Sequence, residues 1–395
     1  MDYPTYNLRA QSTAPGAYQK AVAKLADTVM VMGEDVRPAV EAYGHFVAET
    51  GCEERRSHAE YLLEALMIGG LWRARGHEAT VAASAHGPVI RRLVGERRAG
   101  CGRRRDGSNA ALVLIDVPFV PGRPDPTVGD FTVLLEWLLA SGEYDDEFVR
   151  LEGWQEFFAA APAADSMLRA LVTLADAFDT ASASALGRFT AHVDVFRQQV
   201  LPLRGPREDT VQCSRRRVEY HFNMVGAEIL NRAWRADFLA CERHVVVLPG
   251  CARRRADAQC LAHRSDIELH CTGCTPDCTV AAATKVAAAA GAQALAVIHG
   301  SDFGRFLRSP SLSGGKVGIV GVACVPGLVG AGWRARAQGL LAQCVLLESS
   351  GCAHWRTSAV PTSVDVAELA GVLVDRKNAR KPQTTGTSVP VASAA

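Results

Sequence analysis

Short apolar runs alternate with alanine-rich stretches in the last third of the chain, and this alternation constrains the fold more than any other feature. Four runs have the length and composition of buried strands: residues 245–248, 294–298, 317–322 and 344–347. The stretches between them have the composition of helices: residues 279–290, 304–308 and 326–338. Strands that alternate with helices are typical of a parallel sheet with helices packed on its faces. We therefore predict a doubly wound α/β domain in the C-terminal half of the chain.

The residues upstream of this region have the pattern of helices. Three segments carry apolar side chains at three- and four-residue spacing, which predicts helices with one buried face: residues 17–32, 36–50 and 57–76. Residues 111–120 are apolar and β-branched, and they fit either a strand or a buried helix end. We predict three parts: a mostly α-helical domain (residues 1–205), a cysteine-rich α/β domain (206–375) and a disordered tail (376–395) rich in Thr, Ser and Pro.

Charge and hydropathy indicate the compartment of the protein and which partners it is expected not to bind. The net charge of +1 does not suit a dedicated nucleic-acid binder, which usually has a strongly basic domain. The most apolar long stretch, residues 279–298, contains Lys285 and indicates a helix followed by a strand rather than a membrane span. The first residues include Asp2 and Arg9 and lack the apolar core of a signal peptide. We expect a cytoplasmic protein that binds neither nucleic acid nor membrane.

The chain has 12 cysteines, and thiols in the cytoplasm stay reduced, so clusters of them favour metal ligation or catalysis over disulfides. Cys271, Cys274 and Cys278 lie within eight residues, with Cys260 just upstream. Such closely spaced thiolates with a more distant partner are typical of iron–sulfur ligation. A zinc ribbon usually has two separated C-x2-C pairs, and this segment has one. Zinc and unliganded buried thiols remain the alternatives to an iron–sulfur cluster.

Three further cysteines follow predicted strands. Cys251 and Cys324 come directly after or near the end of an apolar run, and Cys352 follows a third run closely. Because the carboxyl ends of parallel strands lie at one edge of a sheet, these three thiols are expected to converge there. The alternative is that cysteine, as a small hydrophobic residue, is simply common near strand ends. The scattered cysteines are expected to be unliganded: Cys52, Cys101, Cys213 and Cys241.

Residues 206–370, about 40% of the chain, resemble a cysteine-rich family known as domain of unknown function 116. The resemblance is carried by six segments: 218–232, 248–251, 271–280, 321–324, 342–347 and 351–355. It implies an iron–sulfur protein without a defined reaction. Where the family pattern has Cys-Gly-Cys, this chain has Ser350-Gly351-Cys352, so a hydroxyl replaces one potential thiolate.

Polar residues near these cysteines are candidates for substrate chemistry. On a helix over residues 218–235, offsets of 7, 11 and 14 residues return to nearly the same face. The candidates for proton transfer from this helix are Glu219, His221 and Glu228. The candidates for substrate contact are Arg232, Arg235, His299, Ser301 and His354. The alternative for the helix is an ordinary solvated face.

Two hypotheses for function follow. In the first, the chain is an iron–sulfur enzyme for a small molecule. A 4Fe-4S cluster on Cys260, Cys271, Cys274 and Cys278 relays electrons, supplied by a ferredoxin-type reductant. A second cluster, on Cys251, Cys324 and Cys352, has an open iron for reductive, dehydrating or sulfur-transfer chemistry. In the second hypothesis the chain is a non-catalytic electron carrier, redox sensor or scaffold.

Overall fold

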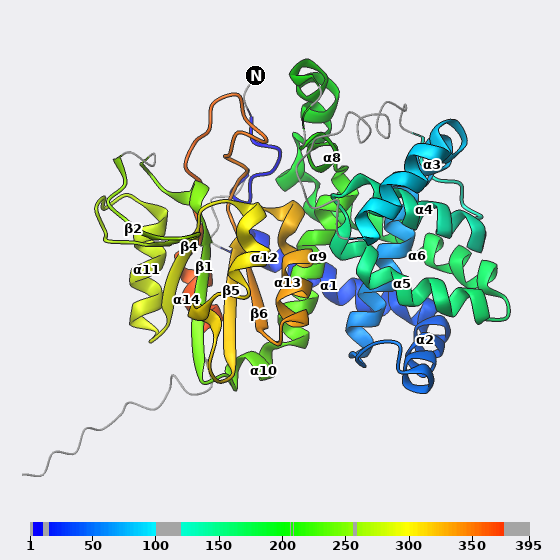
Figure 1. The fold of residues 1–395 in the computed structure, drawn as a ribbon, viewed down its shortest axis with the longest axis horizontal. Coiled ribbons are helices and arrows are strands. Elements are labelled where there is room, and N and C mark those ends of the chain that lie inside the picture. The colour runs from blue at the N-terminus through cyan, green and yellow to red at the C-terminus, as the bar shows by residue number, and fades with distance from the viewer. Residues whose placement is uncertain are drawn as a thin grey trace, which may run out of the picture.

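The computed structural model describes residues 3–10, 16–99, 120–205, 207, 209–255 and 259–374. A helical region forms one side of the molecule and a six-stranded, mostly parallel sheet forms the other (Figure 1). This arrangement confirms the predicted order of a helical N-terminal region and an α/β C-terminal region. Residues 111–119 of the predicted strand or helix end lie outside the described residues, as do Cys101 and the predicted tail at 376–395.

The helical region is built around one long helix, α3. Its helices are α1 (Ala17–Met32), α2 (Arg37–Thr50), α3 (His58–Arg98), α4 (Val128–Ser141), α5 (Asp145–Ala160) and α6 (Ala164–Leu186). Capping boxes start α3 at Ser57 and α4 at Thr127, where side-chain oxygens accept from the first-turn N–H groups. The helix predicted over residues 17–32 is confirmed at both ends. The helix predicted to end near residue 76 continues to Arg98, and its backbone is kinked at His86, two residues before Pro88.

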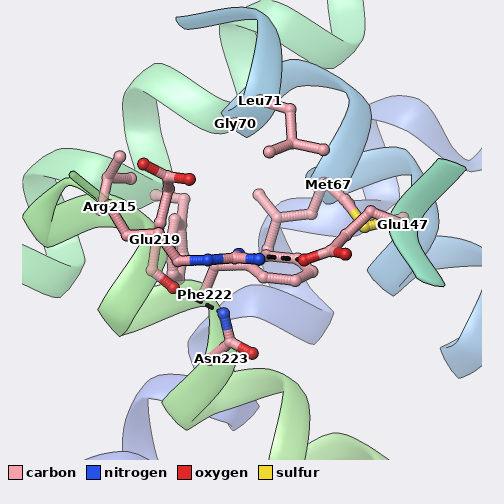
Figure 2. A pocket seen from close by; sticks show the side chains of 11 residues that line it. Met67, Gly70, Leu71, Glu147, Arg215, Glu219, Phe222 and Asn223 are labelled. Carbon is pink, nitrogen blue, oxygen red and sulfur yellow. Dashed lines mark hydrogen bonds and ion pairs between the residues drawn. The ribbon is translucent and has the colours of Figure 1, made fainter. Parts of the chain in front are cut away.

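Two adjacent glycines on α3 provide a test of this packing. A Cβ added at Gly69 would lie 2.1 Å from the carbonyl oxygen of Leu171 on α6, so only glycine permits this close approach. A Cβ added at Gly70 would meet nothing within 4 Å, because Gly70 lines an internal cavity of about 20 Å³ (Figure 2).

We expect Gly69→Ala to lower the free energy of unfolding by about 2–3 kcal/mol, because the added methyl group forces α3 and α6 apart. Gly70→Ala is expected to raise it by about 1 kcal/mol, because alanine is the better helix former and space is available. Urea unfolding of the two variants beside the wild type measures both changes. Equal effects of the two substitutions would contradict the close approach of α3 to α6 at Gly69 and the free space at Gly70.

The sheet has the strand order β2-β3-β4-β1-β5-β6. Its strands are β1 (Arg243–Pro249), β2 (His263–Ser265), β3 (Glu268–His270), β4 (Gln293–Val297), β5 (Val317–Ala323) and β6 (Leu341–Leu346). The four predicted apolar runs become β1, β4, β5 and β6, and these strands pair in parallel. The sequence analysis did not predict β2 and β3, an antiparallel hairpin with only three residues in each strand.

Helices cover both faces of the sheet because each central strand is apolar on both sides. On β1, Val246 and Leu248 belong to a cluster of buried apolar side chains. This cluster includes residues of α11 (Thr279–Ala289) and α14 (Val366–Leu373). Val245 and Val247 belong to a second cluster of buried apolar side chains on the other face of the sheet, which includes residues of α9 (Arg217–Ala233) and α13 (Leu328–Ala337). That second cluster is continuous with the core of the helical region. Among the described helices, none is both apolar and long enough to cross a membrane.

Two short helices complete the sheet region: α10 (Arg235–Leu239) and α12 (Phe303–Phe306). Between the helical region and α9 the chain forms short turns, including α7 (Val193–Val195) and α8 (Thr210–Cys213). The start of α9, with the preceding residues Arg215 and Arg216, is anchored to the helical region by buried ion pairs. The two regions therefore share α9 as a common element.

Candidate functional site

A cavity of about 790 Å³ lies between the carboxyl-terminal edge of the sheet and the helical region. Residues that follow each of the four parallel strands line it: Cys251 after β1, His299 and Ser301 after β4, Cys324 after β5, and Ser350, Cys352 and His354 after β6. The three strand-end cysteines thus line one cavity, as the parallel strand pattern predicted. Three of the five residues predicted for substrate contact, His299, Ser301 and His354, line the same cavity.

Local backbone geometry sets the position of each edge cysteine. Gly250 precedes Cys251, and a Cβ at Gly250 would lie 2.6 Å from the carbonyl oxygen of Ile298, so glycine lets the ends of β1 and β4 approach closely. Cys324 follows β5 and precedes the short turn Val325–Gly327 that leads into α13. Backbone N–H groups of His354 and Trp355 lie near the sulfur of Cys352 and lower its pKa against the effect of burial. Such N–H donors stabilise a thiolate.

The three edge thiols are close enough to influence one another's ionisation. Burial and, to a smaller extent, a thiolate at Cys352 raise the pKa of Cys251 to about 11. Burial also raises the pKa of Cys324, with additional effects from Cys352 and Cys251. The pKa of Cys352 is likewise raised by burial, against the opposing effect of the N–H donors. Three thiolates are therefore compatible in this cavity only when a cation compensates their charge.

The N-terminal segment lies against the same edge. Thr5 donates its backbone N–H to the hydroxyl of Ser350 at 2.9 Å, and Asn7 forms an antiparallel bridge with Ser349. Ser350 therefore lines the cavity with its hydroxyl already hydrogen-bonded to Thr5. Tyr6, between these two contacts, is buried, and its hydroxyl has no hydrogen-bond partner among the described residues. A buried donor without an acceptor at this position is consistent with a group that binds at the edge cysteines.

The helical region supplies the opposite wall, which the sequence analysis did not identify. The loop between α4 and α5 brings Glu143 to the cavity, and the first turn of α5 brings Asp145, Asp146 and Glu147. Four arginines come from other elements: Arg97, Arg207, Arg215 and Arg334. Asp146 pairs with Arg334 at 2.9 Å, and Glu147 pairs with Arg215 at 3.0 Å. The only available sequence signal was the acidic run after Gly142, which by itself also suits a solvated helix start.

Glu143 has the ionisation of a group that exchanges protons near neutral pH. Burial raises its pKa from 4.5 to about 7. The charged groups that face it act in both directions: Arg215 and Arg97 lower the pKa, and Asp145 and Asp209 raise it. A carboxyl group with a pKa near the working pH is suited to general acid or base catalysis. Burial also raises the pKa of Asp146 to about 7, although Arg334 opposes the shift.

The second cysteine group lies beyond β3, near the surface. Cys260, Cys271, Cys274 and Cys278 line a hollow of about 10 Å³, so the structure brings these four predicted ligands together. Gly273, at φ +70°, provides the left-handed turn that the loop needs.

Backbone N–H groups point at the sulfurs of this second group. Arg254 N–H lies 3.5 Å from the Cys278 sulfur, and Gly273 N–H lies 3.4 Å from the Cys271 sulfur. The backbone N–H of Leu261, with the Thr275 hydroxyl, lowers the pKa of Cys274. The loop is therefore already arranged to stabilise thiolates.

Among the residues that the structure describes, no three Cys, His, Asp or Glu side chains are grouped closely enough to hold a single metal ion. An iron–sulfur cluster is wider than one ion, because its thiolates bind separate irons. Both cysteine groups consist of sulfur ligands alone, and this donor set suits such a cluster. Cys213, expected to be unliganded, packs near Cys352 in a small cluster with Phe196 and Trp355.

The residues predicted on helix 218–235 do not line the cavity. His221 is fully buried between Thr190 (2.7 Å) and Ser182 (2.9 Å), and burial lowers its pKa to about 3. The expectation that this histidine exchanges protons near pH 7 is therefore wrong. His221 is covered by the helical region rather than by solvent or by the cysteine site.

The other four residues of that helix have structural contacts. Glu219 accepts hydrogen bonds from Arg75 at 2.9 Å and from the Tyr144 hydroxyl at 2.5 Å, behind the cavity wall (Figure 2 shows it beside Arg215). Arg232 bridges Glu228 and Asp27, which joins α9 to α1. Arg235 donates to carbonyl oxygens at the end of α14. None of these residues reaches the edge cysteines.

No family model, no curated protein and no solved structure matches the chain.

Proposed function

We propose that this protein is an iron–sulfur enzyme that acts on a small molecule in the 790 Å³ cavity, with a 4Fe-4S cluster held by Cys251, Cys324 and Cys352. One observation carries the proposal: three cysteines separated by up to about 100 residues in sequence line a single cavity at the edge of the sheet. We also propose that the sheet is doubly wound, since α11 and α13 pack on opposite faces and the chain crosses β1 between β4 and β5. The cavity then lies beside the switch point where such sheets bind ligands.

When bound, a cluster with three thiolate ligands supplies one-electron transfer and an iron with an open coordination position. The residues of the chain would enclose the substrate, orient it and supply a proton. The α4–α5 loop closes the cavity opposite the cysteines and limits the access of water. His299, Ser301 and His354 lie at the strand ends, where they can orient a substrate. Glu143, protonated near neutral pH, can give a proton to a substrate that gains electrons.

The four-cysteine group is proposed as a second cluster that relays electrons. Its loop is close to the surface, which suits exchange with a ferredoxin-type reductant, and its hollow is lined by Arg253, two residues after Cys251 at the cavity. All eleven cysteines among the described residues are free thiols, which fits a reducing compartment such as the cytoplasm. A non-catalytic carrier or redox sensor is the competing function. The cavity favours an enzyme, because an electron carrier has no need for a wall of ionisable groups opposite its cluster.

Anaerobic purification and reconstitution with iron and sulfide test the proposal. We expect a brown protein with acid-labile sulfide and about eight irons per chain, the content of two 4Fe-4S clusters. Small molecules that enter the cavity should change the electron paramagnetic resonance signal of one cluster and not the other. Stoichiometric zinc without sulfide would overturn the cluster assignment. Signals that no small molecule perturbs would favour the carrier.

Glu143 makes the stability of the protein depend on pH in a specific way. Its pKa is about 7 in the folded chain and about 4.5 when unfolded, so the folded state keeps the proton to higher pH. The stabilisation due to Glu143 is therefore complete below pH 4.5 and is lost as pH rises through 7. Glutamine resembles the protonated form at every pH. We expect Glu143→Gln to match the wild type at pH 4.5 and to be more stable by about 2 kcal/mol at pH 8.5.

Chemical unfolding at the two pH values measures this difference. Glu49→Gln, at an exposed position on α2, is the matched control and should behave as the wild type at both. A Glu143→Gln protein whose stability follows the wild type across the whole range would show that Glu143 ionises like an ordinary surface carboxylate. It would then lose its proposed role as the acid.

A further inference from the structure

Tyr6 is the buried polar group near the edge cysteines that has no role in the proposed function so far. Its side chain is 1% exposed, and its hydroxyl lacks a hydrogen-bond partner among the described residues. Buried hydroxyl groups nearly always find a partner, since water is no longer available to them. An unpaired tyrosine hydroxyl in a tightly packed region therefore requires an explanation.

The surrounding contacts hold the ring of Tyr6 in place. On either side of it, Thr5 is hydrogen-bonded to Ser350, and Asn7 pairs with Ser349 and donates its N–H to the carbonyl of Phe189 at 2.8 Å. The ring lies 6.3 Å from that of Tyr220, at an interplanar angle of 58°. These contacts prevent the hydroxyl from turning to solvent or to another acceptor.

The groups near the Tyr6 hydroxyl are the edge cysteines, Tyr220 and the backbone N–H of Val325, and an N–H can donate to the phenol oxygen but cannot accept its proton. Cys324 and Cys251 lie close enough for the charges of their thiolates to act on the phenol. A neutral thiol is a weak hydrogen-bond acceptor, and a thiolate is a much stronger one. Binding of a cluster converts these thiols to thiolates, so it also provides the acceptor that the phenol lacks.

We propose that Tyr6 donates a hydrogen bond to the sulfur of Cys324, or to a sulfide next to it, when the edge cysteines hold their cluster. This inference rests on the proposed function and adds a residue that the cysteine pattern does not include. A hydrogen bond to a cluster sulfur withdraws negative charge from it, and this stabilises the reduced, more negative state. Tyr6 therefore sets the edge cluster at a higher reduction potential than the thiolates alone would.

Tyr6→Phe removes the hydroxyl and keeps the ring, so it tests the inference directly. We expect the reconstituted variant to retain its iron and sulfide and to show a lower reduction potential for the edge cluster. The potential of the four-cysteine cluster should not change. Tyr18→Phe is the matched control, since Tyr18 is equally buried, packs edge-on against Phe189 and should leave both potentials unchanged.

The possible outcomes separate this inference from the proposed function. A wild-type chain that takes up no iron and sulfide would overturn the proposed function. A loaded Tyr6→Phe protein with the wild-type potential would overturn the role of Tyr6 and leave the cluster in place. A measurement on the unchanged chain is independent of variant folding: with tyrosine ¹³C-labelled at Cζ, one tyrosine carbon should show magnetic coupling to the reduced edge cluster. Absence of this coupling would also overturn the inference.

Discussion

Cys324→Ala is expected to remove one of two clusters and to leave the other intact. Iron and sulfide should fall to about half of the wild-type content, because a cluster left with two thiolates is no longer held. The remaining signal should be that of the four-cysteine group, since Cys260, Cys271, Cys274 and Cys278 line a separate hollow. Metal analysis and electron paramagnetic resonance of the reconstituted variant measure this loss.

Cys344→Ala is the matched control for this substitution. Cys344 is also buried and lies on the neighbouring strand β6, but it lines neither cysteine site. Its variant should keep the full iron content. The reciprocal variant, Cys274→Ala, should lose the four-cysteine cluster and keep the edge cluster. If Cys324→Ala retained all of its iron, the edge cysteines would not form a cluster site, and the electron-carrier function would become the better proposal.

Arg75→Met is expected to lower the free energy of unfolding by about 3–5 kcal/mol, the largest stability change among the substitutions considered. The Arg75 side chain is completely buried and pairs with Glu78 at 3.0 Å and Glu219 at 2.9 Å. It also donates to the carbonyl oxygen of Ser214 at 3.0 Å. Methionine fills similar space but leaves two buried carboxylates without one of their cationic partners. Urea unfolding monitored by circular dichroism measures the change.

Arg92→Met, on the exposed part of the same helix, is the control. Arg92 and Glu96 are 61% and 50% exposed and lie 3.9 Å apart, so this pair should contribute less than about 1 kcal/mol. The contacts of Arg75 with Glu78, Glu219 and Ser214 also position the start of α9 and the preceding Arg215 at the cavity wall. Arg75→Met should therefore weaken ligand effects on the edge cluster as well as stability. Equal stability of the two variants would show that the buried network is not required for folding.

Local pattern was sufficient to predict the elements that support the edge site. Apolar runs bounded by helical composition predicted β1, β4, β5 and β6, since a strand buried on both faces is apolar throughout. The positions of Cys251, Cys324 and Cys352 then followed from topology alone, because parallel strands end at the same edge. Each of these conclusions depends on neighbouring residues or on a rule shared by all parallel sheets.

The contacts between distant segments were decided only by the tertiary structure. Helical spacing places His221 on a face but does not say what packs against that face, and here Thr190 and Ser182 bury it. The proximity of Glu143 to the cavity and of Tyr6 to Cys324 depends on how the helical region and the N-terminal segment pack on the sheet. Burial then sets the ionisation of these groups, since desolvation shifts a pKa in a way that no local pattern contains. The sequence by itself thus determined the cysteine framework, and packing determined which other groups surround it.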